Sequence, residues 1–133
     1  MAMRACADRW ISDSCRIYLF SEGSTHLYVG RTNNLRQRLA GHCRVSSSHF
    51  SATCAFRIAR ETTERLKASY SATGSRAALV LEPEFAAAFA SAKARLASLD
   101  IRFVEEQDSV RQALLEIYVA TALRTPYNDF EKH

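Results

Sequence analysis

Two short stretches of alternating side chains near the start of the chain constrain its fold most. Residues 15–20 (CRIYLF) and 26–31 (HLYVGR) alternate between apolar and other side chains, and five turn-forming residues around Gly23 separate them. Such alternation predicts β-strands, and so short a connection joins antiparallel neighbours. The sequence therefore predicts a β-hairpin over residues 15–31.

The register of this hairpin can also be predicted. Symmetry about Gly23 places the following residues opposite one another: Tyr18 and Tyr28, Arg16 and Gly30, Phe20 and His26. Because side chains alternate between the faces of a strand, both tyrosines then share one face and a purely apolar set shares the other. That apolar set is Ile17, Leu19, Leu27 and Val29.

Helical periodicity and capping residues predict four helices after the hairpin. They are expected over residues 33–41, 53–70, 83–98 and 109–123, with one further strand over residues 101–105 and a short helix or arm over residues 1–14. The order β-β-α-α-α-β-α predicts a small mixed α/β (α+β) domain, in which helices flank a three-stranded, mostly antiparallel sheet. With 133 residues and no linker or repeat, a single domain over residues 1–133 is expected.

Basic residues are concentrated in the middle of the chain. Residues 31–76 carry nine basic and two acidic residues, a net charge of +7, whereas residues 77–133 carry six basic and nine acidic ones, a net charge of −3. A basic stretch is typical of a protein that binds a phosphate backbone, and equally of a solvated surface without a partner. Charge alone leaves both interpretations open.

The sequence carries no signal for a membrane or for secretion. No apolar run approaches the ~18 residues of a transmembrane helix, and the N-terminus lacks the apolar core of a signal peptide. The four cysteines form no C-x-x-C pair and have no histidine at a zinc-site spacing, so free thiols are expected. We expect a soluble, cytoplasmic protein with no membrane partner.

The last predicted helix contains one unusual carboxylate. Glu116 lies within ALLEIYVATAL, and a helix that is apolar on all sides is expected to be buried. A buried carboxylate needs a partner, because an isolated charge is costly in an apolar interior. Two partners fit: a nearby arginine, or a metal ion such as Mg²⁺, which often takes only one or two protein carboxylates.

The two strands of the hairpin carry motifs that resemble those of the GIY-YIG nucleases. The first strand contains Arg16-Ile17-Tyr18 and the second contains Tyr28-Val29-Gly30, at the spacing that the family shows. The chain departs from the family pattern at Arg16, which stands where the family has a glycine.

The resemblance continues along the chain over residues 15–128. Arg38 falls where the family has its catalytic arginine, and His42 falls where several members carry a histidine one turn later. Glu116 matches the metal-binding glutamate of the family, and Asn128 in the segment PYND matches its final asparagine.

The resemblance implies metal-dependent hydrolysis of a phosphodiester bond. Glu116 would hold one Mg²⁺ or Mn²⁺, and Arg38 would stabilise the charge on the phosphate. Tyr18 would be the general base, with its pKa lowered from ~10 by Arg38, the metal and Arg16.

Three further residues would complete such a site. Tyr28 and His42 would orient or relay the proton, and Asn128 would position the metal shell or the phosphate. Each expected site residue also has a purely structural interpretation, which the sequence leaves open: a cross-strand pair for the two tyrosines, a surface charge for Arg38, a helix-end cation for His42 and a turn residue for Asn128.

Nucleic acid is the expected partner, and only the resemblance favours DNA over RNA. The residues expected to contact it, without reading its sequence, are Arg31, Arg36, His49, Arg57 and Arg60. Two other interpretations remain: a binding module of the same fold that does not cleave, and a protein-interaction domain that uses the amphipathic stretch 83–99. Sequence specificity would come from loops, from a homodimer or from an accessory protein.

Overall fold

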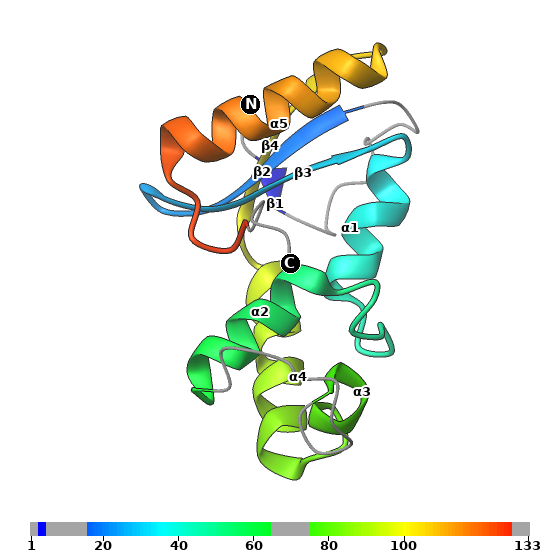
Figure 1. Ribbon diagram of the computed structural model, residues 1–133, viewed down its shortest axis with the longest axis vertical. Coiled ribbons are helices and arrows are strands. Elements are labelled where there is room, and N and C mark those ends of the chain that lie inside the picture. Colours follow the sequence, from blue (N-terminus) through cyan, green and yellow to red (C-terminus); the bar gives the residue numbers. More distant parts are fainter. Residues whose placement is uncertain (1–2, 5–15, 65–74, 129–133) are drawn as a thin grey trace.

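A computed structural model describes residues 3–4, 16–64 and 75–128 of the chain. Its elements are β1 (Met3–Arg4), β2 (Arg16–Glu22), β3 (Thr25–Thr32), α1 (Leu35–Cys43), α2 (Thr53–Thr62), α3 (Arg76–Leu79), α4 (Pro83–Ala97), β4 (Asp100–Glu105) and α5 (Ser109–Leu123). The strands form one antiparallel sheet in the order β1-β4-β2-β3 (Figure 1). The predicted fold class and its three strands are confirmed; the short β1 and α3 were not predicted.

Helices cover both faces of the sheet. α5 lies across one face, and α1, α2 and α4 gather on the side of the other (Figure 1). The larger core lies on the second side and includes Tyr18, Phe20, Leu39, Phe56 and Phe85. A smaller core lies under α5 and contains Ile17, Val29 and Ala120. The sheet is therefore the middle layer of the domain.

The hairpin pairs in a register that differs from the predicted one. Tyr18 lies opposite Gly30 and Phe20 lies opposite Tyr28, so the pairing is displaced by two residues. A displacement by an even number keeps each side chain on its face. Both tyrosines therefore still point to the same side of the sheet, as predicted.

The end of the hairpin explains this difference. The strands remain paired up to Glu22 and Thr25, which leaves a two-residue turn with Gly23 at φ +63°, a conformation that favours glycine. A β-bulge then makes Leu27 the extra residue of β3. Leu27 packs into the larger core, and its predicted place on the opposite apolar face is wrong.

Capping residues begin two of the helices where the sequence predicts them. The side chain of Asn34 accepts a hydrogen bond from the backbone N–H of Gln37, and Asp108 does the same for Arg111. Pro83 occupies the first turn of α4. These local signals place the starts of α1, α4 and α5 correctly.

α2 ends earlier than the predicted residue 70. Its last residue is Thr62, and the hydroxyls of Thr62 and Thr63 bond back to carbonyls one turn earlier. Glu64 then takes a left-handed conformation, φ +61°, which ends the helical path. Residues 65–74, which contain the rest of the predicted helix, lie outside the described residues, as do residues 1–2 and 5–14 of the predicted short helix or arm.

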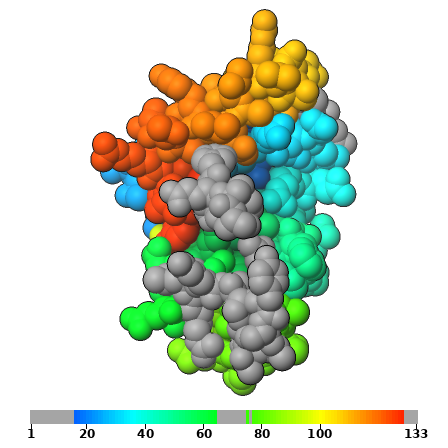
Figure 2. Space-filling view, viewed as in Figure 1, coloured from blue at the N-terminus to red at the C-terminus, as the bar shows by residue number. Residues whose placement is uncertain are grey.

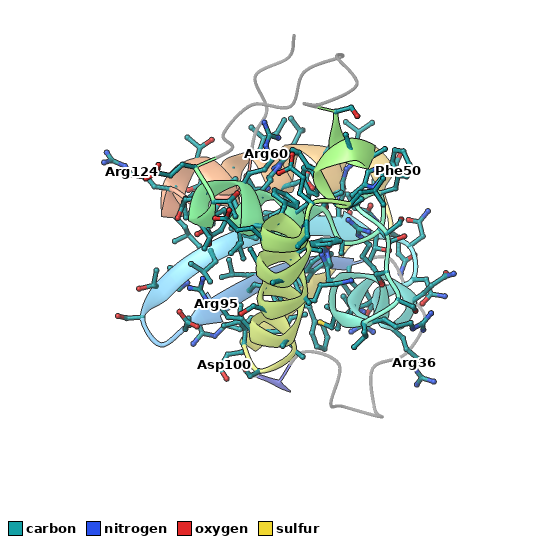
Figure 3. All side chains as sticks on the ribbon, turned by 90° about the horizontal axis from the view of Figure 1, so that it is seen from below. Arg36, Phe50, Arg60, Arg95, Asp100 and Arg124 are labelled. Atoms are coloured by element: carbon teal, nitrogen blue, oxygen red, sulfur yellow. The ribbon has the colours of Figure 1, made fainter. Side chains whose placement is uncertain are left out.

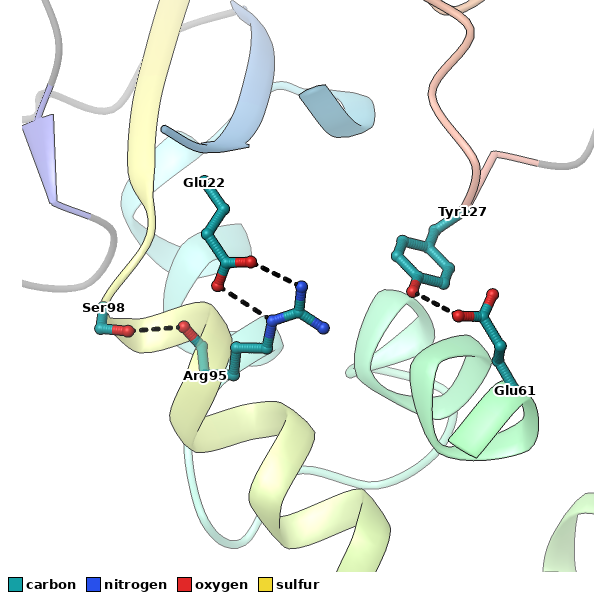
Figure 4. A network of polar contacts seen from close by, with 5 residues as sticks. All are labelled: Glu22, Glu61, Arg95, Ser98 and Tyr127. Atoms are coloured by element: carbon teal, nitrogen blue, oxygen red, sulfur yellow. Dashed lines mark hydrogen bonds and ion pairs between the residues drawn. The ribbon is translucent and has the colours of Figure 1, made fainter. Parts of the chain in front are cut away.

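α4 packs its apolar side into the domain. Phe85, Phe89 and Leu96 are buried in the larger core. At its C-terminal end, Arg95 donates two hydrogen bonds to the carboxylate of Glu22 on β2, at 2.7 and 3.0 Å (Figure 4). The apolar side of the amphipathic stretch 83–99 thus packs into the core of its own domain, whereas a protein-binding role for this stretch was only one of the alternatives that the sequence left open.

α5 is not buried on all sides, and that prediction is wrong. Gln112 and Ala120 face the sheet and are buried, whereas Leu114, Ile117 and Tyr118 face away and are exposed. The sequence could not distinguish these faces because apolar residues occupy both of them. In the described part of the chain, no helix is long and apolar enough to cross a membrane.

Candidate functional site

Four predicted site residues meet on the core side of the hairpin: Tyr18, Tyr28, Arg38 and His42. The hydroxyl of Tyr18 and Nε2 of His42 are hydrogen bonded at 2.8 Å, and both side chains are buried. The ring of His42 packs edge-on against Tyr18 and Tyr28, with centroid distances of 5.8 and 5.5 Å. α1 continues to Cys43, so Arg38 and His42 lie one turn apart on the same side of this helix.

Gly30 makes room for the ring of Tyr18. The two residues face each other across the hairpin, and a Cβ atom at position 30 would overlap the hydroxyl and Cζ of Tyr18. A steric requirement therefore explains the glycine in the second strand motif, since any side chain at position 30 would displace the buried ring of Tyr18.

The guanidinium of Arg38 is fixed by the segment that leads into α2. Nη1 donates to the backbone carbonyl of Ser51 at 2.8 Å, and Nη2 donates to Oγ1 of Thr53 at 3.2 Å. Burial disfavours the charged form, but the hydroxyls of Tyr18 and Tyr28 outweigh it and raise the pKa of Arg38. A planar cation held in this way is suited to bind phosphate oxygens.

Burial keeps both Tyr18 and His42 neutral. The loss of water, and next the nearby Tyr28, raise the pKa of Tyr18 well above 10.0, although Arg38 opposes them. Burial and then the charge of Arg38 lower the pKa of His42 to about 3. The expected lowering of the Tyr18 pKa by neighbouring cations is therefore outweighed in this conformation.

One ring nitrogen of His42 has no hydrogen-bond partner. Nδ1 is buried and unpaired among the described residues, whereas Nε2 pairs with the hydroxyl of Tyr18. Which of these two groups donates depends on the tautomer, because a neutral imidazole carries its proton on only one nitrogen.

Glu116 lies on the opposite face of the sheet. Its Oε1 is 3.7 Å from Nε of Arg31, the residue that follows Gly30 on β3. Burial raises the pKa of Glu116, and the charge of Arg31 opposes that shift. The predicted arginine partner is therefore present, and β3 carries both halves of the candidate site: Tyr28 on one face and Arg31 on the other.

The residues present fit a divalent metal held by one carboxylate. Glu116 is partly exposed, and in the described part of the chain no group of three His, Cys, Asp or Glu side chains could hold a metal. Mg²⁺ and Mn²⁺ accept such a site because waters and substrate phosphate complete their coordination. Burial raises the pKa of the Cys54 thiol to about 12, which disfavours the thiolate form.

Asn128 clamps the outer edge of β3. Its Oδ1 accepts a hydrogen bond from the N–H of Val29 at 2.8 Å, and its Nδ2 donates to the carbonyl of Val29 at 2.7 Å. Nearby, the N–H of Tyr127 donates to the carbonyl of Leu27 at 3.2 Å. The amide side chain therefore acts as a substitute strand partner for Val29, and the backbone of Tyr127 fixes β3 on the other side of Tyr28.

Two of the residues expected to contact nucleic acid are exposed on the surface of the domain. Arg36 is exposed on α1 and points away from the domain (Figure 3). Arg31 is exposed on β3, where it pairs with Glu116. These two side chains are accessible to a phosphate backbone.

The other three residues expected to contact nucleic acid, His49, Arg57 and Arg60, contact other parts of the domain. Arg57 donates to the backbone carbonyl of Tyr127. The rings of His49 and Phe56 have centroids 5.9 Å apart, and the guanidinium of Arg60 lies 5.9 Å from the Phe56 centroid. These side chains therefore contribute to packing, whatever else they contact.

The sequence did not single out the residues that hold this region in place. Ser51 and Thr53 fix Arg38, while the buried Lys93 donates to the carbonyls of Val45 and Ser47, at 2.7 and 3.0 Å. A lysine four residues after Phe89 on the apolar side of a helix was a detectable signal for the loop anchor. Ser51 and Thr53 carried no signal, because their partner lies more than ten residues earlier in the chain.

The fold and this cluster define a class of protein: a small α/β domain in which a fixed arginine lies against a hairpin with two tyrosines. The family model for the GIY-YIG catalytic domain matches residues 15–128, nearly the whole chain. The chain belongs to the GIY-YIG family, whose members are nuclease-type hydrolases. The comparisons found no matching curated protein and no matching solved structure.

Proposed function

We propose that this protein is a metal-dependent endonuclease that hydrolyses phosphodiester bonds of DNA. The observation that carries the proposal is the fixed guanidinium of Arg38, which lies beside the hydroxyls of Tyr18 and Tyr28. Phosphoryl chemistry depends mainly on positioned charge, and a bound arginine supplies it without reorganisation. The proposal includes a single domain over residues 1–133 and a cytoplasmic location, with specificity supplied by loops, an accessory protein or a homodimer.

Glu116 is the proposed metal ligand. When bound, Mg²⁺ or Mn²⁺ would neutralise charge on the scissile phosphate and on the leaving oxygen. Arg31, 3.7 Å from the carboxylate, is placed to bind a neighbouring phosphate of the same strand. Asn128 positions the edge of β3 between these groups through its two hydrogen bonds to Val29.

The role of proton acceptor is assigned to the phenol oxygen of Tyr28, which would act in its deprotonated form. Tyr18, the general base expected from the sequence, is only 1% exposed and has a raised pKa, whereas Tyr28 is partly exposed beside Arg38. Tyr18 and His42 then hold the inner side of the cluster through their mutual hydrogen bond. Arg38 connects the two tyrosines and would carry part of the charge on Tyr28.

The tyrosine assignment can be tested with two matched variants. Tyr28→Phe should lower kcat strongly and leave the unfolding free energy almost unchanged, because its hydroxyl lies at the partly exposed side. Tyr18→Phe removes a buried hydrogen bond to His42, so it should lower stability by about 0.5–1.5 kcal/mol with a smaller effect on kcat. If Tyr18→Phe lowers kcat strongly and Tyr28→Phe does not, Tyr18 is the base.

The nuclease activity itself is tested by cleavage of labelled single-stranded and double-stranded DNA, with Mg²⁺ or Mn²⁺. Glu116→Gln should abolish cleavage and keep DNA binding, while Glu84→Gln, the same change at an exposed position of α4, should cut like the wild type. The same assay with labelled RNA decides the class of nucleic acid.

A module that binds nucleic acid without cleaving it is the alternative. The ion pair with Arg31 favours it, since that contact already satisfies the Glu116 carboxylate without a metal. If wild type and Glu116→Gln both fail to cut, and both bind DNA with an affinity that falls steeply with salt, this alternative replaces the nuclease proposal.

A further inference from the structure

The outer face of α5 carries a continuous apolar seam. Four large side chains face away from the sheet and are exposed: Val110 (65%), Leu114 (62%), Ile117 (47%) and Tyr118 (70%). Val110, Leu114 and Ile117 follow one another at intervals of four and three residues, and the small Thr121 comes four residues later, so these four positions lie along one side of the helix. We call these four positions, together with Tyr118, the α5 seam.

Packing among the described residues does not explain the seam. α5 already buries its opposite side, where Ala120 lies against Ile17 and Val29 of the sheet. The helix runs along one end of the molecule (Figures 1 and 2). An apolar stripe of this regularity on an outer surface is characteristic of a helix that pairs with another helix.

The charges at the two ends of α5 indicate which helix fits. Three acidic residues, Glu105, Glu106 and Asp108, precede the helix, while the exposed Arg124 follows it. The seam itself contains no charged residue, and the one cation beside its acidic end among the described residues of α5 is Arg111, which lies near Glu106 and Leu114. The acidic end would repel a nucleic acid or an anionic membrane, whereas a second α5 running in the opposite direction would place Arg124 beside it.

We propose that the α5 seam is a homodimer interface, in which two copies of the chain pair their α5 helices antiparallel about a twofold axis. Overlap of the whole seam places the axis between residues 115 and 116, so that Leu114 faces Ile117 of the second copy and Val110 faces Thr121. Arg124 then lies beside Gln107 of the second copy, between Glu106 and Asp108.

This arrangement leaves the candidate active site open. Glu116 is on the sheet side of α5, about half a turn around the helix from Leu114, and it contacts Arg31 of β3. Pairing through the seam therefore does not cover the carboxylate. The proposal does not depend on the nuclease function, and its test requires no cleavage.

The first test is the mass of the full-length chain in solution over a wide range of concentration. The wild type should rise from 14.9 kDa to twice that mass, and Leu114→Glu should stay at the mass of one chain. Leu81→Glu is the matched control, because Leu81 is an equally open leucine (81% exposed) between α3 and α4, and it should dimerise like the wild type.

A charge-reversal pair tests the antiparallel register. Ile117→Lys alone should also be monomeric, but an equimolar mixture with Leu114→Glu should recover the dimer mass, because the introduced carboxylate of one chain then faces the introduced ammonium group of the other. A parallel pairing would bring each residue to its own counterpart and would give no recovery. Recovery therefore distinguishes the proposed interface from association through another surface.

Three results would overturn the proposal. The first is a wild type that remains monomeric at every concentration. The second is a Leu114→Glu variant that remains dimeric while folded. The third is a large drop in the unfolding temperature of Leu114→Glu without any change in mass, which would mean that the chain itself covers the seam.

Discussion

The phenol of Tyr18 occupies the space that a side chain at position 30 would need. Gly30→Ala should therefore force this buried ring out of place and break its hydrogen bond with His42. Strain of this kind in a packed core costs about 1–3 kcal/mol. Urea unfolding measures the loss, and a change in tyrosine fluorescence would report the displaced ring.

The matched control for this change is Gly41→Ala. A Cβ at position 41 would meet the Cβ and the carbonyl oxygen of Ser51, at ordinary distances of 3.7 and 3.8 Å, and the position lies within α1. Alanine there should stabilise the protein by about 0.5–1 kcal/mol. Equal losses at both positions would contradict the steric explanation.

Neutral His42 makes the stability of the domain depend on pH. The pKa of His42 falls from the ordinary 6.5 to about 3 in the folded protein, so between these values the unfolded chain binds a proton that the folded protein does not. Stability therefore rises with pH across this window, and it is lost as the pH falls from about 6.5 towards 3. The contribution is about 1.4 kcal/mol for each pH unit within the window.

A variant without an ionisable group at position 42 isolates this effect. His42→Gln keeps a polar side chain and should flatten the pH dependence of the unfolding free energy between pH 6.5 and 3, while lowering stability at neutral pH. If wild type and variant lose stability in parallel on acidification, His42 is not the titrating group.

At the scale of elements, the segment after α5 joins parts of the fold that are distant in sequence. Tyr127 and Asn128 bond to the edge of β3, and the hydroxyl of Tyr127 donates to Glu61 of α2 at 3.0 Å (Figure 4). Asn128 contributes both a donor and an acceptor to Val29. This pair of hydrogen bonds needs a side-chain amide, because a carboxylate of the same shape can accept from the N–H of Val29 but cannot donate to its carbonyl.

Asn128→Asp should therefore destabilise the protein by about 1–3 kcal/mol at neutral pH, because a carboxylate would face the carbonyl of Val29 with no proton to donate. The same change at Asn34 should cost nothing, since that side chain only accepts a hydrogen bond, from the N–H of Gln37. Thermal unfolding of both variants measures the difference; a harmless Asn128→Asp would show that the donor half is unimportant.

Sequence patterns predicted the elements better than their partners. Alternation and caps located β2, β3, β4, α1, α4 and α5, because each signal is local. The bulge at Leu27 and the turn at Gly23 set the register, and they depend on how the whole sheet packs. The early end of α2 depends on two threonine hydroxyls, which satisfy carbonyls within their own helix.

At the scale of the whole molecule, the formal charge of +4 indicates that binding to nucleic acid will weaken with salt. If Arg36 contacts a phosphate, Arg36→Ala should reduce the slope of log K against log salt by about 0.9. Arg102→Ala is the control, since Arg102 is exposed on β4 among the acidic residues of that strand. Equal slopes for all three proteins would remove Arg36 from the binding surface.

The arrangement of the candidate site was only partly predictable. The spacing of Arg38 and His42 predicted that they share one face of α1, and the alternation in the hairpin predicted that the tyrosines share one face of the sheet; the structure has both arrangements. Glu116 was predicted as buried, but α5 has one buried and one exposed apolar side, and the carboxylate lies at the edge between sheet and solvent. Which apolar side of α5 is buried depends on how the helix packs on the sheet, and the helical periodicity of the sequence does not predict this.

The docking of Tyr127 and Asn128 on β3 has a consequence beyond stability. β3 is the last strand of the sheet, and its outer edge would otherwise present free backbone N–H and carbonyl groups to other chains. The amide of Asn128 and the backbone of Tyr127 occupy these groups at Val29 and Leu27. The segment thus protects the domain from edge-to-edge aggregation, and a variant in which it detaches should be lost as insoluble protein before it loses its fold.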